Sequence, residues 1–206
     1  MSRRGSTKRW LQIQSRDPFV KQRDAEGYRS RAAFKLKEIL ERDRLLKPGD
    51  RVLDLGGSPG GWSQVAKEVV GRRGAVVAVD LLPMEPLEGV AFIQGDSGAP
   101  EIVEAVKATL GGAPVDLVLS DMAPNLSGVR HADEARSVAL AEVAIEAAEN
   151  FLKPEGTILI KMFQHADTEK FIAALRPRCQ AILRRKPRAS REKSPEFYIV
   201  VRGFKL

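Results

Sequence analysis

Two lysines and two carboxylic acids, far apart along the chain, have neighbours that suit a catalytic site. Lys161 ends an apolar run, where an unpaired ammonium group would be energetically expensive. Taken singly, Lys35 could be an exposed helix residue and Glu196 a charge that protects a strand edge. Together with Asp121, which follows another apolar run, these groups could remove a proton from a substrate hydroxyl or stabilise its anion.

A glycine-rich loop indicates a cofactor pocket in the same chain. Residues 54–62 read Asp-Leu-Gly-Gly-Ser-Pro-Gly-Gly-Trp and include the end of a short apolar run. Glycines allow a tight turn and a close approach of a ligand to the backbone, and open α/β sheets bind ligands at the carboxyl ends of their strands. The loop matches neither the G-x-G-x-x-G pattern nor a Walker motif, which disfavours nicotinamide cofactors and nucleotide phosphates.

Two acidic residues at the ends of later apolar runs could complete a pocket for an adenosine. Asp80 could accept hydrogen bonds from both ribose hydroxyls, and Asp96 could bind the adenine amino group. Each alone is better explained as a helix cap or a turn residue, and Trp62 could equally be a core residue. Combined with the glycine-rich loop, they predict a pocket for S-adenosylmethionine.

The spacing of apolar residues predicts strands that alternate with helices. The expected helices span residues 30–43, 62–70, 101–110, 132–152 and 168–175. The expected strands span residues 51–55, 75–79, 90–93, 115–119, 157–162, 181–185 and 197–201. Such alternation implies a parallel sheet covered on both faces. The last two strands, joined by a loop alone, should pair as an antiparallel hairpin at one edge.

These elements predict an α/β protein with a Rossmann-like class I methyltransferase fold. The sheet would have seven strands, mostly parallel with an antiparallel edge strand, and helices on both faces. The sequence shows no internal repeat and no second domain, so residues 1–206 are expected to form a single methyltransferase domain. A basic N-terminal extension would occupy about residues 1–28.

The distribution of charge predicts a polyanionic partner. The net charge is +7, but residues 1–35 hold ten basic against three acidic side chains, and residues 176–193 hold eight against one. The remainder of the chain is therefore acidic. Two basic segments on an acidic body are typical of a nucleic-acid-binding surface, although a solvated tail and a solvated loop would also account for them.

Composition excludes several classes of protein. No run is apolar enough to span a membrane, and the single cysteine, Cys179, rules out an internal disulfide and fits a reducing compartment. With two histidines and one cysteine, a zinc cluster is not expected, and we predict no metal. The first residues superficially resemble a transit peptide, but Trp10 and Phe19 could anchor them to the domain. A bacterial cytoplasm is therefore predicted ahead of a mitochondrion.

Several stretches together resemble the FtsJ/RrmJ-type ribose 2′-O-methyltransferases, and among them the bacterial enzymes that act on large-subunit ribosomal RNA. The resemblance covers nearly the whole chain and rests on residues 9–12, 30–36, 54–64, 80–84, 94–96, 120–125, 161–164 and 196–200. The Lys-Asp-Lys-Glu set in its four contexts is the most specific part. The chain departs from the family at Gly57 and Ser58, where two alanines are usual, and at Ala33, where an aromatic residue is common.

The resemblance implies a cofactor site and a catalytic site. S-adenosyl-L-methionine would be bound by Gly56, Gly60, Gly61, Trp62, Asp80, Leu81, Asp96 and Asp121. The catalytic residues, called the tetrad below, would be Lys35, Asp121, Lys161 and Glu196. Lys161, at the centre, would either accept the hydroxyl proton or stabilise the forming alkoxide as a cation, and the sequence leaves both roles open. The transfer itself requires no metal.

The implied substrate is a uridine ribose in the A-loop of 23S ribosomal RNA, methylated on assembled 50S particles by a monomeric enzyme. Phosphate contacts would come from Arg29, Arg31, Arg184, Arg185, Lys186, Arg188 and Arg191. Trp10, Tyr28 and Tyr198 could stack on bases, although packing would explain each equally well.

Three other functions stay open at this point. The same chemistry on transfer RNA or an mRNA cap is the nearest, but the compact length and the full-length resemblance favour ribosomal RNA. A non-catalytic RNA-binding assembly factor would be favoured by the loss of a tetrad residue, and none is lost. A nicotinamide oxidoreductase is disfavoured by the missing G-x-G-x-x-G pattern.

Overall fold

The computed structural model describes residues 18–124, 130–191 and 194–206 of the chain. Predictions on earlier residues, among them the role of Trp10 and most of the basic N-terminal extension, lie outside the described residues, as do Asn125 and Lys193. Within the described ranges, no helix is both long enough and apolar enough to cross a membrane.

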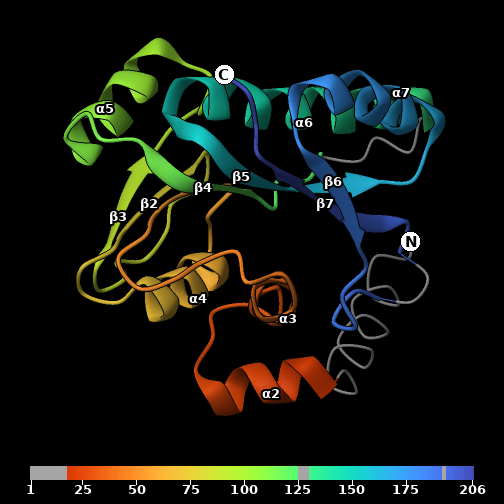
Figure 1. Cartoon of the computed structure of the whole chain (residues 1–206). Helices are drawn as coiled ribbons and strands as arrows, with labels where there is room; N and C mark the ends of the chain where they lie inside the picture. Colours follow the sequence, from red (N-terminus) through yellow and green to blue (C-terminus); the bar gives the residue numbers. More distant parts are fainter. Residues whose placement is uncertain (1–17, 125–129, 192–193) are drawn as a thin grey trace, which may run out of the picture.

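A seven-stranded sheet forms the centre of the structure, in the order β3-β2-β1-β4-β5-β7-β6 (Figure 1). The strands are β1 Arg51–Leu55, β2 Ala75–Asp80, β3 Val90–Gln94, β4 Val115–Ser120, β5 Leu152–Phe163, β6 Ala181–Arg185 and β7 Glu196–Arg202. Neighbouring strands are parallel from β3 to β5, and β7 is antiparallel to both β5 and β6. The predicted α/β class and mostly parallel, seven-stranded sheet are confirmed.

The hairpin of β6 and β7 lies at one edge of the sheet, as predicted, but the antiparallel strand is not the edge strand itself: it is β7, one position in from the edge. β7 pairs on both sides, and its residues 197–201 are buried. The outermost strand is β6, which is partly exposed and carries Arg184 and Arg185. A continuous apolar strand suits a position between two neighbours, whereas a charged strand suits an edge.

Helices cover both faces of the sheet (Figure 1). The helices are α2 Pro18–Glu26, α3 Ala33–Asp43, α4 Gly61–Val70, α5 Pro100–Leu110, α6 Arg130–Phe151 and α7 Ala166–Leu175. One hydrophobic core lies between the sheet and α3 with α4, and the other lies between the sheet and α5, α6 and α7. Alternate residues of a strand enter opposite cores: Leu53 and Leu55 pack on the α6 side, and Val52 packs on the α4 side.

The topology gathers the predicted site residues at one edge of the sheet, called the carboxyl edge below. Parallel strands end on the same side, so Asp80 at the end of β2, Asp121 after β4 and Lys161 near the end of β5 lie along this edge. Because β7 runs the other way, it begins at the same edge with Glu196, opposite Phe163 of β5.

Candidate active site

Lys161 and Asp121 form an ion pair at the carboxyl edge. Lys161 Nζ lies 3.1 Å from Asp121 Oδ1 and donates a hydrogen bond of 2.8 Å to the backbone oxygen of Asp121. Only 9% of the Lys161 side chain is exposed. An ammonium group has three donors, so Lys161 retains one that could bind a substrate oxygen.

Lys35 and Glu196 form a second ion pair, with Nζ and Oε1 2.5 Å apart. Lys35 lies in the first turn of α3 and Glu196 at the start of β7. Burial by itself would raise the pKa of Glu196, but the charge and hydrogen bond of Lys35 outweigh it and lower the pKa below its usual value. The carboxylate therefore remains ionised and holds the lysine in place.

Tyr198 connects the two ion pairs. Its hydroxyl donates a hydrogen bond of 2.9 Å to Asp121 Oδ1, and Lys35 Nζ lies 5.7 Å from the centre of its ring. Burial, reinforced by the charge of Asp121, raises the pKa of Tyr198 well above its ordinary value, so the phenol remains a donor. This role of Tyr198 was not predicted from the sequence. A signal was present, because Glu196 and Tyr198 are two residues apart on one strand and therefore share a face.

The expectation that Tyr198 or Tyr28 could stack on a base is wrong. Tyr198 is 0% exposed and packs against Trp62, with ring centres 5.6 Å apart. Tyr28 is also buried, and its hydroxyl donates to Glu68. Both rings lie in the core beneath α3 and α4, so neither offers a free face to RNA.

The loop that follows β1 takes a shape that requires glycine at two positions. Gly56 and Gly60 have φ values of +76° and +111°, which residues with a side chain rarely adopt. A Cβ atom on Gly56 would also lie 2.8 Å from Met122 Cγ and 3.2 Å from the Met122 amide nitrogen. The loop therefore packs directly against the segment that carries Asp121.

The start of α4 adds hydrogen-bond donors to this loop. The first backbone N–H groups of a helix have no partner within it and attract negatively charged groups, and here they belong to Gly61 and the residues after it. The Trp62 side chain is 3% exposed and donates to the Ala32 carbonyl. A cofactor contact of Trp62 would therefore involve its backbone, and the ring packs in the core.

Polar and apolar groups suited to an adenosine line the carboxyl edge beside β2 and β3. The Asp80 carboxylate accepts hydrogen bonds from the amides of Ser58 and Leu82, at 2.9 and 2.8 Å, and so joins the loops after β1 and β2. Asp96 accepts from the Gly98 amide in a turn and is exposed. Leu81 is 69% exposed, so its side chain could cover an adenine ring. These residues fit S-adenosylmethionine.

Asp54 is a further candidate that the sequence analysis did not assign. It is fully buried, Oδ2 accepts a hydrogen bond of 2.6 Å from Ser63, and Oδ1 has no hydrogen-bond partner among the described residues. Burial, followed by the nearby charges of Asp121 and Asp80, raises the pKa of Asp54 to about 7. A positively charged ligand at the loop would stabilise its ionised form. A carboxylate inside an apolar strand was the available signal.

The residues predicted to bind RNA differ in how strongly they are engaged within the protein. Arg185 forms a two-point ion pair with Asp43, with bonds of 2.7 and 2.6 Å. Arg184 pairs with Glu169, and Lys186 donates to the Ser194 carbonyl. The guanidinium group of Arg29 donates to backbone carbonyls of the loops after β1 and β2.

Arg188 and Arg191 present the most available charges of this set. The Arg188 side chain is 90% exposed, and among the described residues its ion-pair contact is a long one, 4.0 Å to Glu38. Arg191 is also exposed. Arg31 and Arg191, with Ser194, line a cavity of about 430 Å³ that also contains the Lys35–Glu196 pair. Burial and then the charge of Arg191 lower the pKa of Arg31, as expected where cations are crowded. Such a cavity suits a phosphate beside the tetrad.

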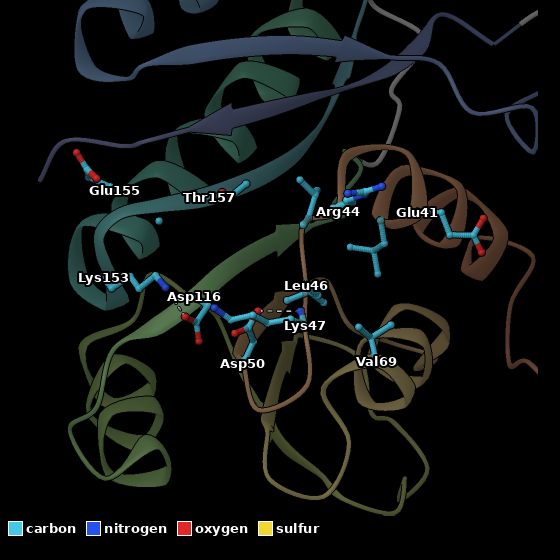
Figure 2. A pocket seen from close by; sticks show the side chains of 13 residues that line it. Glu41, Arg44, Leu46, Lys47, Asp50, Val69, Asp116, Lys153, Glu155 and Thr157 are labelled. Carbon is cyan, nitrogen blue, oxygen red and sulfur yellow. Dashed lines mark hydrogen bonds and ion pairs between the residues drawn. The ribbon is translucent and has the colours of Figure 1, made fainter.

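A larger groove of about 610 Å³ lies across the sheet from the carboxyl edge, at the amino ends of the parallel strands (Figure 2). It is lined by residues near the starts of β4 and β5, among them Asp116 and Lys153, and by the segment after α3. Lys153 Nζ lies 2.5 Å from Asp116 Oδ1, so these charges satisfy each other. None of the tetrad lines this groove, and size alone does not identify the catalytic site.

Comparisons with known proteins identify what the chain is similar to. The family model for FtsJ-like methyltransferases matches residues 28–204. Ribosomal RNA large subunit methyltransferase E of Marinobacter nauticus is 48% identical over 206 residues, covering 100% of both chains. The protein of the same name from Xanthomonas euvesicatoria pv. vesicatoria is 51% identical over 202 residues, covering 98% of this chain and 96% of its own.

Solved structures agree on the fold. A ribosomal RNA methyltransferase from Plasmodium falciparum superposes with a TM-score of 0.77 at 30% identity, covering 86% of this chain and 98% of that one. Fibrillarin of Aeropyrum pernix, solved with natively bound S-adenosyl-L-methionine, gives a TM-score of 0.55 at 18% identity, covering 82% and 73%. At that identity the fibrillarin likeness supports the fold alone.

Proposed function

We propose a specific activity for this chain, which belongs to the FtsJ-like methyltransferase family. It uses S-adenosylmethionine to methylate the ribose 2′-hydroxyl of a uridine in large-subunit ribosomal RNA. The observation that carries the proposal is the meeting of the Lys161–Asp121 and Lys35–Glu196 pairs beside a glycine-rich loop. The names of the relatives support ribosomal RNA over transfer RNA or an mRNA cap. We place the target in the A-loop of assembled 50S particles, in the bacterial cytoplasm.

The cofactor would supply an electrophilic methyl group on a sulfonium. The residues that would hold it are Asp54, Gly56, Gly60, Gly61, Trp62, Asp80, Leu81, Asp96 and Asp121. The start of α4 would bind its carboxylate, and the Asp80–Leu81 region its adenosine. The protein contributes mainly by orienting the hydroxyl for an in-line displacement, which is a large part of catalysis in such a reaction.

Lys161 acts on the hydroxyl oxygen in this mechanism. Asp121 fixes the ammonium group, and the remaining N–H of Lys161 would hydrogen-bond the 2′-oxygen as negative charge develops on it. Because a charged ammonium group cannot accept a proton, the hydroxyl proton would pass to solvent water as the oxygen–methyl bond forms and the methyl–sulfur bond breaks. Tyr198 holds the Asp121 carboxylate from the other side. Lys35 adds a second positive charge, which Glu196 keeps in position. The cavity lined by Arg31 and Arg191 would bind a phosphate next to the target ribose.

The direct test is transfer of labelled methyl from S-adenosylmethionine to isolated 50S particles, free 23S RNA and transfer RNA, followed by nucleoside analysis. A single 2′-O-methyluridine in 50S particles is expected. Label in transfer RNA would move the function to the nearest alternative. Cofactor binding with no methyl transfer to any RNA would favour a non-catalytic assembly factor.

The affinity for S-adenosylmethionine is expected to fall as the pH drops below 7. A cationic ligand favours ionised Asp54, whose pKa in the free protein is about 7, so binding at lower pH must first remove a proton. The dissociation constant should rise toward about tenfold per pH unit below that point. Isothermal titration at pH 5.5 to 8 measures this, and Asp54→Asn should flatten the profile. If the dissociation constant depends on pH in the same way in the parent and in Asp54→Asn, this role of Asp54 is contradicted.

The raised pKa of Asp54 also predicts how the free energy of unfolding depends on pH. In the unfolded chain an aspartate ionises near about pH 3.9, whereas Asp54 in the fold ionises near about 7. Between these values the folded state binds the extra proton, so the contribution of Asp54 to stability falls as the pH rises and becomes constant above 7. Denaturant unfolding of Asp54→Asn, compared with the parent, measures this contribution.

Reversal of two exposed charges should weaken binding to 50S particles. Arg188→Glu with Arg191→Glu would place one carboxylate in the lining of the proposed phosphate cavity and another three residues earlier in the same segment. Affinity should fall by at least about tenfold at low salt, with a shallower salt dependence. The matched control reverses Arg72 and Arg73, two exposed residues in the turn after α4 at the far end of the sheet. Equal losses in both proteins would indicate nonspecific charge effects and contradict this RNA interface.

A further inference from the structure

The guanidinium group of Arg29 crosslinks the two loops that would enclose the cofactor. Its NH1 donates to the Pro59 carbonyl at 3.3 Å and to the Glu85 carbonyl at 2.5 Å. Its NH2 donates to the Pro86 carbonyl at 2.6 Å. Pro59 belongs to the glycine-rich loop after β1, and residues 85 and 86 belong to the segment that follows Asp80, the last residue of β2, and begins with Leu81. One side chain therefore ties the methionine side of the pocket to the adenosine side.

The neighbours of Arg29 fix it against the loop. Its backbone amide donates to Gln64 Oε1 at 2.8 Å, and Gln64 Nε2 donates to the Gly27 carbonyl at 3.1 Å. A Cβ atom on Gly60 would lie 3.1 Å from both Cδ and NH1 of Arg29, and one on Gly61 would collide with Ser30 Oγ. Residues 27–30 thus lie directly on the loop and on the start of α4.

We propose that Arg29 is a positioning residue of the cofactor site and that its charge does not serve to bind RNA. This inference rests on the proposed function, because it takes S-adenosylmethionine to be the ligand of the two loops. Arg29 is bound to carbonyl groups through its guanidinium, whereas Arg191 is exposed and lines the cavity of the Lys35–Glu196 pair. Arg29 and Arg191 look alike in the sequence, but Arg29 would support binding of the cofactor and Arg191 binding of RNA.

The physical effect of Arg29 is preorganisation. A ligand that binds two loops must hold both in one arrangement, and any ordering done in advance improves its affinity. Besides Arg29, the loops are joined by the amides of Gly56 and Gly57, which donate to Val79, and by Ser58, whose amide donates to Asp80 and whose hydroxyl donates to the Pro83 carbonyl at 3.0 Å. Among the described residues, the Arg29 crosslink is the one that extends to residues 85 and 86.

The test compares affinity for the cofactor with affinity for the particle. Arg29→Ala should raise the dissociation constant for S-adenosylmethionine by roughly tenfold to a hundredfold, and the KM for it similarly. Affinity for 50S particles, measured with S-adenosylhomocysteine at saturation, should change by less than about twofold, because the ligand then orders the loops. Arg191→Ala should show the opposite pattern. Arg72→Ala, an exposed arginine distant from both sites, should match the parent.

Arg29→Lys provides a second readout if the alanine variant does not fold. Lysine retains the charge but cannot present the planar fork that reaches carbonyls in both loops, so cofactor affinity should still fall while particle affinity is retained. Unchanged cofactor affinity in Arg29→Lys, or weaker particle binding with unchanged cofactor affinity in Arg29→Ala, would overturn the inference. Failure of the parent protein to bind S-adenosylmethionine would instead overturn the proposed function.

Discussion

Lys161→Ala is expected to reduce methyl transfer by about a thousandfold or more while leaving the affinity for S-adenosylmethionine within about twofold of the parent. The variant removes the cation that would face the 2′-oxygen in the proposed mechanism, and it leaves the glycine-rich loop and Asp80 unchanged. The loss should therefore appear in kcat rather than in KM for the cofactor. Single-turnover transfer to 50S particles, with cofactor binding measured separately, distinguishes these effects.

The matched control for this variant lies on the same strand. Lys153 is also on β5 and also pairs with an aspartate, Asp116, but at the opposite edge of the sheet (Figure 2). Lys153→Ala should leave kcat unchanged. Normal turnover in Lys161→Ala would exclude a catalytic role for Lys161. Lys161→Arg is also informative, because an arginine cannot accept the hydroxyl proton, and activity in that variant would require Lys161 to act as a cation.

Asp121→Asn is expected to lower kcat by about a hundredfold to a thousandfold. The amide has nearly the same size but no charge, so the Lys161 ammonium group loses its ionic partner at 3.1 Å. The backbone bond from Lys161 to residue 121 can persist, which makes the variant a test of the charge itself. Tyr198 retains an acceptor in the amide oxygen, so the fold should be preserved. Initial rates at saturating cofactor and particle concentrations measure the effect.

Asp116→Asn is the control for the second prediction. It removes the Asp116 carboxylate near the start of β4, at the amino ends of the parallel strands. Lys153 then loses its ionic partner, as Lys161 does in Asp121→Asn. Thermal unfolding should change similarly in the two variants, whereas only Asp121→Asn should lose activity. Equal activity in the two variants would show that the Asp121 charge is not needed for transfer.

The apolar patterns of the sequence were sufficient to predict the sheet and most of its helices. Continuous apolar runs such as residues 75–79 are typical of parallel strands buried on both faces, and this run forms β2. Local turns were harder to predict. The expected helix over residues 30–43 begins only at Ala33, and α2 over residues 18–26 was not predicted, because it has no buried residues and hence no apolar pattern.

In the candidate site, too, some features could be predicted from the sequence and others depend on the tertiary structure. By itself, the sequence singled out the four tetrad residues and the glycine-rich loop, because each stands in a distinctive local context. Asp121, Lys161 and Glu196 lie at or beside the ends of predicted strands, and Lys35 lies in a predicted helix. Only the tertiary structure decided how they pair: Lys35 bonds a residue 161 positions away, and Tyr198 bonds one 77 positions away. No local pattern encodes such a distance, because strand order and direction bring the partners together.

The basic residues show most clearly what could not be predicted from the sequence. In the sequence, Arg29, Arg185 and Arg191 are equivalent positive charges beside a predicted site. In the structure, Arg29 binds loop carbonyls, Arg185 binds Asp43, and Arg191 is exposed at a cavity. The sequence determined that the protein carries enough positive charge to bind a polyanion. Which charges remain available depends on the partners that folding supplies, and an arginine paired with a carboxylate has less of its charge left for RNA.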